Sequence, residues 1–145
     1  MRLAESVRQV GGLVAVEHTC FRVLGRRAPA ISPPSHVRWA SGASLAHDWR
    51  RRQLVELLPV SVGLATPEEL TVLPACELGR SVAELDRAPE LVRAVLTGCY
   101  PLLLSAYREL LAAASSPADG ALWRVLGRVL YDLEVVASDG AVLVS

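Results

Sequence analysis

Apolar residues recur every three or four positions along most of the chain, which is the spacing of amphipathic α-helices. The pattern predicts four long helices, at about residues 3–24, 35–58, 89–114 and 117–137. The clearest apolar stripe lies in the last of them and consists of Leu122, Val125, Leu126, Val129, Leu130, Leu133 and Val136. We therefore expect an all-α protein.

Proline and glycine residues mark where these helices should begin and end. Pro33 and Pro34 precede the second helix, and the Ser-Pro-Ala-Asp stretch at 116–119 is a start signal for the fourth. The Ser-Asp-Gly stretch at 138–140 predicts the end of that helix. Pro101 lies inside the third helix and should kink it, because proline removes a backbone hydrogen bond.

The long stretch between the second and third helices is less regular. Thr66 should cap a helical turn over residues 67–69, Gly79 should break the chain, and residues 81–87 form a candidate short helix. Gly11 and Gly12 interrupt the pattern of the first helix and indicate either a close helix contact or a slight bend there. Four long helices with one long connection predict a single domain over residues 1–145, an up-down four-helix bundle with one crossover.

Composition narrows the class of protein. The 145 residues are 52% hydrophobic, enough for a core, and 15 basic residues balance 15 acidic ones, which argues against a nucleic-acid partner. No apolar run is long enough for a signal peptide or a membrane span, so we expect a cytoplasmic protein with no membrane association. Three widely spaced cysteines without a CxxC pair argue against a disulfide framework or a structural zinc site.

Two polar residues interrupt apolar stripes and are the leading candidates for chemistry. Glu17 lies within the core stripe of the first helix, and His47 shares a face with small and apolar residues of the second. A buried carboxylate needs a proton, a cation or a metal beside it. Both residues are a similar number of positions from the loop that joins their helices, so we expect them to meet inside the bundle, as a salt-bridged core or as a working site.

Further polar residues fall at suitable positions to join this pair. Arg50 follows His47 by one turn, Tyr107 lies in the middle of the third helix, and Asp132 and Glu134 are alternatives on the fourth. We expect Glu17 and His47 as acid–base residues, with Arg50, Tyr107 and either Asp132 or Glu134 lining a polar central pocket.

Glu17, His47, the long crossover and the stretch Ala-His-Asp-Trp-Arg-Arg at 46–51 resemble small bacterial members of the ferritin-like superfamily. The resemblance implies a di-iron ligand set, which is degenerate here. Ser44 replaces the glutamate of the Glu-x-x-His motif that ends at His47, no histidine follows Asp132 or Glu134 by three residues, and the third helix lacks its glutamate. We therefore expect no metal cofactor.

These observations favour a protein that binds a small organic molecule. If the protein is an enzyme, it would transform that molecule, in a setting such as bacterial secondary metabolism. Two alternatives stay open. The bundle is a non-catalytic interaction module, or it is an oxidoreductase that uses Glu17, His47 and one C-terminal carboxylate to hold a single iron or manganese. The apolar third and fourth helices also predict a homodimer.

Overall fold

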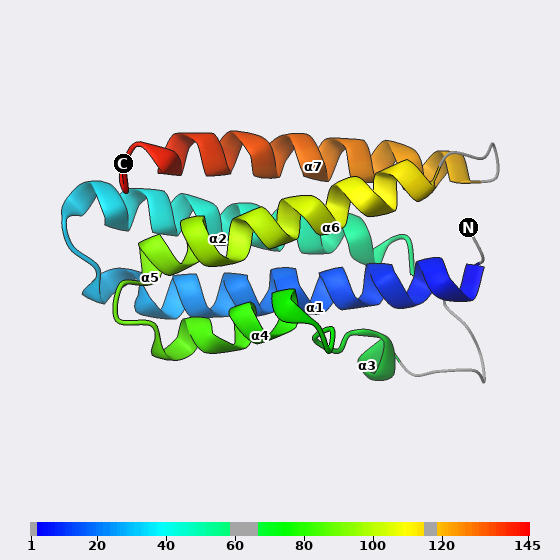
Figure 1. Ribbon diagram of the computed structural model, residues 1–145, viewed down its shortest axis with the longest axis horizontal. Helices are drawn as coiled ribbons and strands as arrows, with labels where there is room; N and C mark the ends of the chain where they lie inside the picture. The colour runs from blue at the N-terminus through cyan, green and yellow to red at the C-terminus, as the bar shows by residue number, and fades with distance from the viewer. Residues whose placement is uncertain (1–2, 59–66, 115–118) are drawn as a thin grey trace.

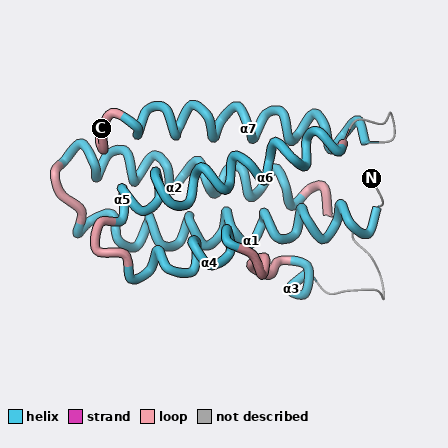
Figure 2. Tube along the Cα trace, in the orientation of Figure 1, coloured by secondary structure: helices cyan, strands magenta, loops and turns pink. Residues whose placement is uncertain are grey.

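The computed structural model describes residues 3–58, 67–114 and 119–145, and the described residues are helical with short connections and no strand (Figure 2). The long helices are α1 (Leu3–Arg27), α2 (Pro34–Val55), α6 (Tyr100–Ala113) and α7 (Gly120–Ala141). Shorter ones are α3 (Pro67–Leu70), α4 (Glu77–Glu84) and α5 (Leu91–Arg93). Short 3₁₀ turns follow α1 at Ala28–Ala30 and α4 at Leu85–Arg87. The expected all-α class is confirmed.

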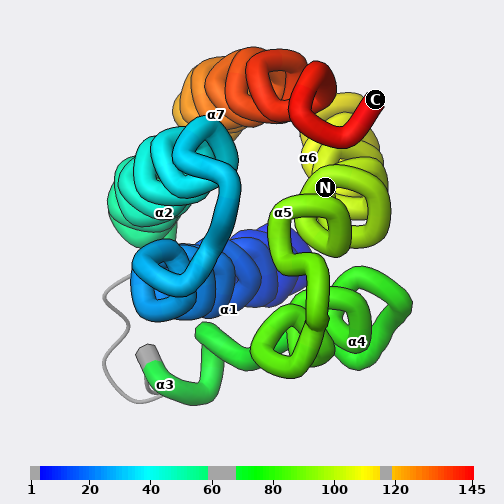
Figure 3. Tube along the Cα trace, turned by 90° about the vertical axis from the view of Figure 1, so that its left-hand side faces the viewer, coloured from blue at the N-terminus to red at the C-terminus, as the bar shows by residue number. Residues whose placement is uncertain are grey.

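The long helices lie side by side, and their directions follow from the connections between them (Figure 1). α2 runs antiparallel to α1, α6 runs in the same direction as α2, and α7 returns antiparallel to α6. The chain can enter α6 in that direction because α3 and α4 carry it back along α1 (Figures 1 and 3). α1 contacts α2, α2 contacts α7, and α7 contacts α6.

The long central stretch contains a change of helical pitch. The residues between α5 and α6, Ala94–Cys99, form a π-helical segment, in which the Tyr100 amide donates to the Val95 carbonyl five residues back. Pro101 has no amide hydrogen to continue an α-helical ladder, and the wider turn immediately precedes it. The disturbance expected at Pro101 therefore takes the form of a π segment within one continuous helical stretch.

One glycine that we expected to break the chain, Gly79, and one that we expected to end a helix, Gly140, both lie inside helices. Gly79 is in α4, where a side chain would run into the Pro74 backbone carbonyl. Gly140 is in α7, where a Cβ atom would lie 2.7 Å from both Trp39 and Leu96. These glycines serve close packing rather than chain termination, so both predicted boundaries are wrong. The expected cap at Thr66 and the start signal at 116–118 lie outside the described residues.

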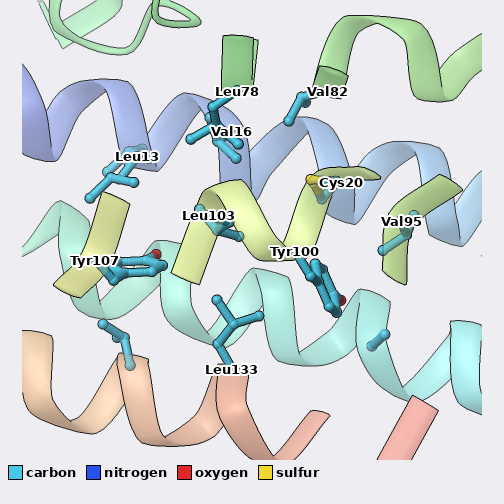
Figure 4. Close-up of a cluster of buried hydrophobic side chains, with 14 of the residues drawn as sticks. Leu13, Val16, Cys20, Leu78, Val82, Val95, Tyr100, Leu103, Tyr107 and Leu133 are labelled. Atoms are coloured by element: carbon cyan, nitrogen blue, oxygen red, sulfur yellow. The ribbon is translucent and has the colours of Figure 1, made fainter. Parts of the chain in front are cut away.

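The glycine pair in α1 behaves as predicted. A Cβ atom on Gly11 would collide with the backbone carbonyl of Leu70, so α3 lies directly against α1 at this point. The main apolar core lies between the long helices and receives side chains from α1, α2, α4, the π segment, α6 and α7 (Figure 4). Among the described residues, no helix has both the length and the hydropathy needed to cross a bilayer.

Candidate functional site

A cluster of polar side chains lies in the middle of this core. Glu17, His47 and Arg50 are fully buried, and the rings of Tyr100 and Tyr107 are as well. The apolar spacing of α1 forces Glu17 inward, because Leu13, Val14 and Cys20 on the same face are buried core residues. On α2, the buried Ala43 and Leu54 orient the face that carries His47 and Arg50. The expected meeting of Glu17 and His47 is confirmed.

Glu17 is the centre of the cluster. Its Oε2 atom lies 2.6 Å from His47 Nδ1, while Oε1 accepts hydrogen bonds from Arg50 Nε at 3.0 Å and from the Tyr107 hydroxyl at 2.7 Å. Three donors from three different side chains thus satisfy one carboxylate. Because these side chains come from α2 and α6, Glu17 ties α1 to both neighbouring helices.

The hydrogen bonds also determine the tautomer of His47. An ionised carboxylate only accepts, so Nδ1 carries the ring proton and donates it to Glu17. Nε2 then accepts from the Tyr100 hydroxyl, at 2.8 Å. Arg50 Nη2 lies 3.0 Å from the same Nδ1 but can only donate, so this contact is not a productive hydrogen bond for a protonated Nδ1. The chain Tyr100–His47–Glu17 is therefore oriented, with a neutral imidazole in the middle.

Arg50 links Glu17 to a second carboxylate. Its Nη1 atom donates to Asp132 Oδ2 at 2.5 Å, and Asp132 is the only partly exposed member of this group, with 33% of its side chain accessible. The guanidinium group therefore lies between two carboxylates, one from α1 and one from α7. The cluster as a whole joins α1, α2, α6 and α7, and within the described residues every buried side-chain polar atom lies within hydrogen-bond distance of a polar group.

The charges set the protonation states. Burial acts to raise the pKa of Glu17, but the Arg50 charge, His47 and the hydrogen bonds outweigh it and lower that pKa to about 2. Burial lowers the pKa of His47, an effect that the Glu17 carboxylate opposes and the Arg50 charge reinforces. Burial raises the pKa of both tyrosines well above its usual range. At neutral pH, Glu17 is thus ionised, His47 neutral and both phenols protonated.

Tyr100 is the member that we did not predict as a site residue. A signal was present, because Tyr100 and Tyr107 are seven positions apart in one helical stretch and therefore share a face. Figure 4 shows both rings on the α6 segment, one on each side of Leu103. The two hydroxyls reach different members of the cluster, His47 and Glu17.

Glu134 does not join the cluster. It lies on the surface of α7, 45% exposed, with Oε1 3.5 Å from Arg108 Nη2 of α6. Of the two predicted alternatives on the fourth helix, the structure thus brings in Asp132. Glu17, His47 and Asp132 do not converge as metal ligands either, because the Arg50 guanidinium lies between Glu17 and Asp132. No group of three or more potential metal ligands occurs among the described residues.

The structure contains a cavity away from the predicted polar pocket. A cavity of about 1050 Å³ opens between the first half of α1, the α3–α4 segment and the second half of α6. Its lining is mainly aliphatic and contains none of the predicted site residues: Ala4, Val7, Arg8, Gln9, Gly12, Leu13, Glu69, Leu70, Val72, Leu73, Pro74, Ala75, Cys76, Leu78, Ala106, Glu109 and Leu110.

Residues that line the cavity and residues of the polar cluster are nevertheless near one another along α1 and along α6. Leu13 and Leu110 line the cavity. Glu17, one turn after Leu13, and Tyr107, one turn before Leu110, belong to the cluster. Both leucines are at least 95% buried, with exposed fractions of 5% and 2%. They therefore form an apolar wall between the cavity and the polar cluster.

No protein-family model, curated protein or solved structure matches this chain significantly.

Proposed function

We propose that this protein is a ferritin-like four-helix bundle that binds a small, mainly apolar organic molecule. The observation that carries the binding function is the cavity between α1, the α3–α4 segment and α6, with its volume of about 1050 Å³. Sites for small molecules are usually hollows of comparable size, on the order of 300–1,000 Å³, lined by apolar groups with few polar ones. α2 and α6 run in the same direction and are joined by a long connection, and this topology supports the ferritin-like arrangement.

The charged groups around the cavity indicate which molecules it would accept. Glu69 and Glu109 contribute two negative charges to the lining and Arg8 one positive charge. A carboxylate or phosphate ligand would face this negative excess, whereas a neutral or cationic molecule would not. The preferred ligand is therefore an apolar molecule that is uncharged or carries a basic group.

The polar cluster supports this function by holding the walls of the cavity in place. Glu17, one turn after Leu13, joins α1 to α2 and α6 by hydrogen bonds. Arg50 joins α7 to these helices through Asp132. Apart from Asp132, its side chains are buried and make their hydrogen bonds within the cluster, so a bound ligand does not need to complete them. The cluster is thus a positioning device.

A second candidate function is acid–base catalysis at Glu17 and His47. The observation that favours it is the oriented chain of hydrogen bonds from Tyr100 through His47 to Glu17, which is the arrangement of a phenol, a base and the carboxylate that orients the base. Such a chain would work only if the wall formed by Leu13 and Leu110 opened to admit a substrate. Ligand binding in the existing cavity needs no such opening and is the simpler proposal.

The test uses N-phenyl-1-naphthylamine, a neutral apolar dye whose fluorescence rises in apolar surroundings. Gly12 lines the cavity, and a Cβ atom there would lie 3.9 Å from its nearest neighbours, so Gly12→Leu fills the cavity without a backbone collision. The matched control is Gly42→Leu on α2, where a Cβ atom meets nothing within 4 Å. Both changes replace a helical glycine by leucine, so their effects on helix propensity are similar.

We expect saturable binding of one dye per chain, a dissociation constant raised at least about tenfold by Gly12→Leu, and no more than about a twofold change for Gly42→Leu. An anionic dye, 8-anilinonaphthalene-1-sulfonate, should bind more weakly than the neutral one. Absence of saturable binding, or equal loss of binding in the two variants, would contradict a ligand site in this cavity.

A further inference from the structure

The lining of the cavity between α1, the α3–α4 segment and α6 is divided into an apolar inner wall and a polar rim. Leu13, Leu78 and Leu110 form the inner wall and are 5%, 6% and 2% exposed. The charged and amide residues of the lining form the rim and are all exposed: Arg8, Gln9, Glu69 and Glu109. A ligand therefore meets hydrocarbon groups inside and polar groups at the opening, an arrangement that suits an amphipathic molecule with its apolar part inward.

The hydrocarbon side chains that the described residues contribute to the cavity are all aliphatic. They belong to alanine, valine, leucine and proline residues, whereas the three tryptophans, three tyrosines and one phenylalanine of the chain lie outside the lining. Aromatic side chains recognise ring-shaped ligands by offset stacking and edge-to-face contacts. Methyl and methylene groups act through dispersion, which depends on close approach and not on ring geometry. A flexible hydrocarbon chain can follow such a surface closely.

The charges of the rim select the head group of such a molecule. Glu69 and Glu109 carry two negative charges and Arg8 carries one positive charge, so the rim is acidic overall. Glu109 directly precedes Leu110 on α6, which places a carboxylate beside the inner wall. A positively charged head group is attracted to this rim, whereas a carboxylate head group is repelled.

From this division we propose that the ligand is a single-chain aliphatic amine, bound with its hydrocarbon chain against the inner wall and its ammonium group at the rim near Glu109. The proposal rests on the proposed function, because it names the class of molecule for the same cavity. The opposite orientation would bury the ammonium group against Leu13 and Leu110, where no counter-charge lines the inner wall, and would leave the chain in water.

Titration calorimetry with straight-chain amines tests the orientation and does not use the dye. From hexylamine to octylamine and from octylamine to decylamine, the dissociation constant should fall about tenfold, because each step buries two further CH₂ groups. Gly12→Leu should raise the dissociation constant of decylamine at least about tenfold, whereas Gly42→Leu should change it no more than about twofold. Affinities that do not rise with chain length would overturn the proposed orientation.

The head group is tested with one chain length and one pair of variants. Decylamine should bind more tightly than 1-decanol, and 1-decanol more tightly than decanoate. Glu109→Gln should weaken decylamine about threefold and leave 1-decanol within about 1.5-fold, as expected for an exposed pair of charges. The matched control is Glu84→Gln, an exposed position outside the lining, which should change neither affinity. Decanoate that binds as tightly as decylamine would overturn the proposed head group.

The outcomes separate this inference from the proposed function. Saturable dye binding that Gly12→Leu weakens, together with no measurable binding of decylamine, would overturn the aliphatic amine and leave the cavity as a ligand site. Binding of 1-naphthylmethylamine as tight as that of decylamine would overturn the preference for an aliphatic chain. Absence of binding for both the dye and decylamine would overturn the proposed function and this inference together.

Discussion

The two tyrosines of the cluster differ in what they bind, and the difference should be measurable. Tyr107 donates to an ionised carboxylate, Glu17, whereas Tyr100 donates to the neutral ring of His47. Hydrogen bonds to charged groups contribute about 1.5–3 kcal/mol and those between neutral groups about 0.5–1.5 kcal/mol. We expect Tyr107→Phe to lower the free energy of unfolding more than Tyr100→Phe in urea titrations. The reverse order would contradict the assigned charge states.

His47 should also leave a signature in the pH dependence of stability. Its pKa is lowered in the folded protein, so below the ordinary value of 6.5 the unfolded chain binds a proton that the folded chain refuses. The free energy of unfolding should therefore fall as the pH drops below that value, by up to about 1.4 kcal/mol per pH unit from this residue. Burial of the neutral ring is the main cause.

The variant His47→Gln should show a shallower decline between pH 6.5 and 5, measured by urea unfolding at each pH. His36→Gln makes the same replacement near the start of the same helix and serves as the matched variant for comparison of the slopes. Glu17 contributes mainly below its ordinary pKa of 4.5, because its lowered folded pKa of about 2 preserves its charge down to strongly acidic pH. A slope that His47→Gln leaves unchanged would mean that the folded protein binds a proton at His47.

Individual side chains of the cluster were predictable to different degrees. Glu17 and His47 each interrupt an apolar stripe, and that single signal was enough to pair them. The full burial of Arg50 was not evident from the sequence, because it begins a run of three arginines that would ordinarily face solvent. Only the position of two carboxylates on other helices, Glu17 and Asp132, makes its burial favourable.

At the scale of the helices, glycine is the residue whose meaning depends most on its neighbours. The sequence alone predicts a chain break at Gly79 and a helix end at Gly140, whereas both glycines are points of close packing within α4 and α7. Local sequence cannot distinguish the two uses, because the second depends on chain segments that are distant in sequence, such as Trp39 against Gly140. The helix bodies were predictable because their apolar period is local.

This difference gives a test at single glycines. Gly11→Ala and Gly79→Ala place a Cβ atom against backbone carbonyls of Leu70 and Pro74, and each should lower the free energy of unfolding by about 1–3 kcal/mol. Gly127→Ala, in open space on α7, should raise it by about 0.5–1 kcal/mol through better helix propensity. Urea titrations provide all three free energies of unfolding. A stabilising effect of Gly79→Ala would contradict the close contact of α4 with the backbone of Pro74.

At the scale of the whole molecule, the long connection forms one wall of the cavity. Counting residues from the loops correctly set Glu17 level with His47, but it gave no information about α3 and α4, which fold back along α1. The cavity exists because these short helices lie against the first half of α1 next to the end of α6. The sequence therefore predicted the polar centre and missed the apolar cavity beside it, since the cavity depends on the tertiary path of an irregular segment.

In the proposed function, the cluster around Glu17 stabilises the packing of the helices, and the cavity lined by Leu13 binds the ligand. Glu17→Gln keeps the volume of the side chain but removes the charge that Arg50 and His47 share. The variant leaves the buried Arg50 guanidinium with one carboxylate partner, Asp132, instead of two. Breaking such a buried pair should cost about 3 kcal/mol.

The most direct test is to measure the stability of Glu17→Gln and its affinity for N-phenyl-1-naphthylamine in the same preparation, under conditions where the variant is folded. The matched control is Glu84→Gln, an exposed position on α4, which should change neither quantity appreciably. The account predicts a loss of about 3 kcal/mol in the free energy of unfolding with a dissociation constant within about threefold of the unchanged protein. Unchanged stability together with lost binding would contradict it, and would make Glu17 part of the ligand site itself.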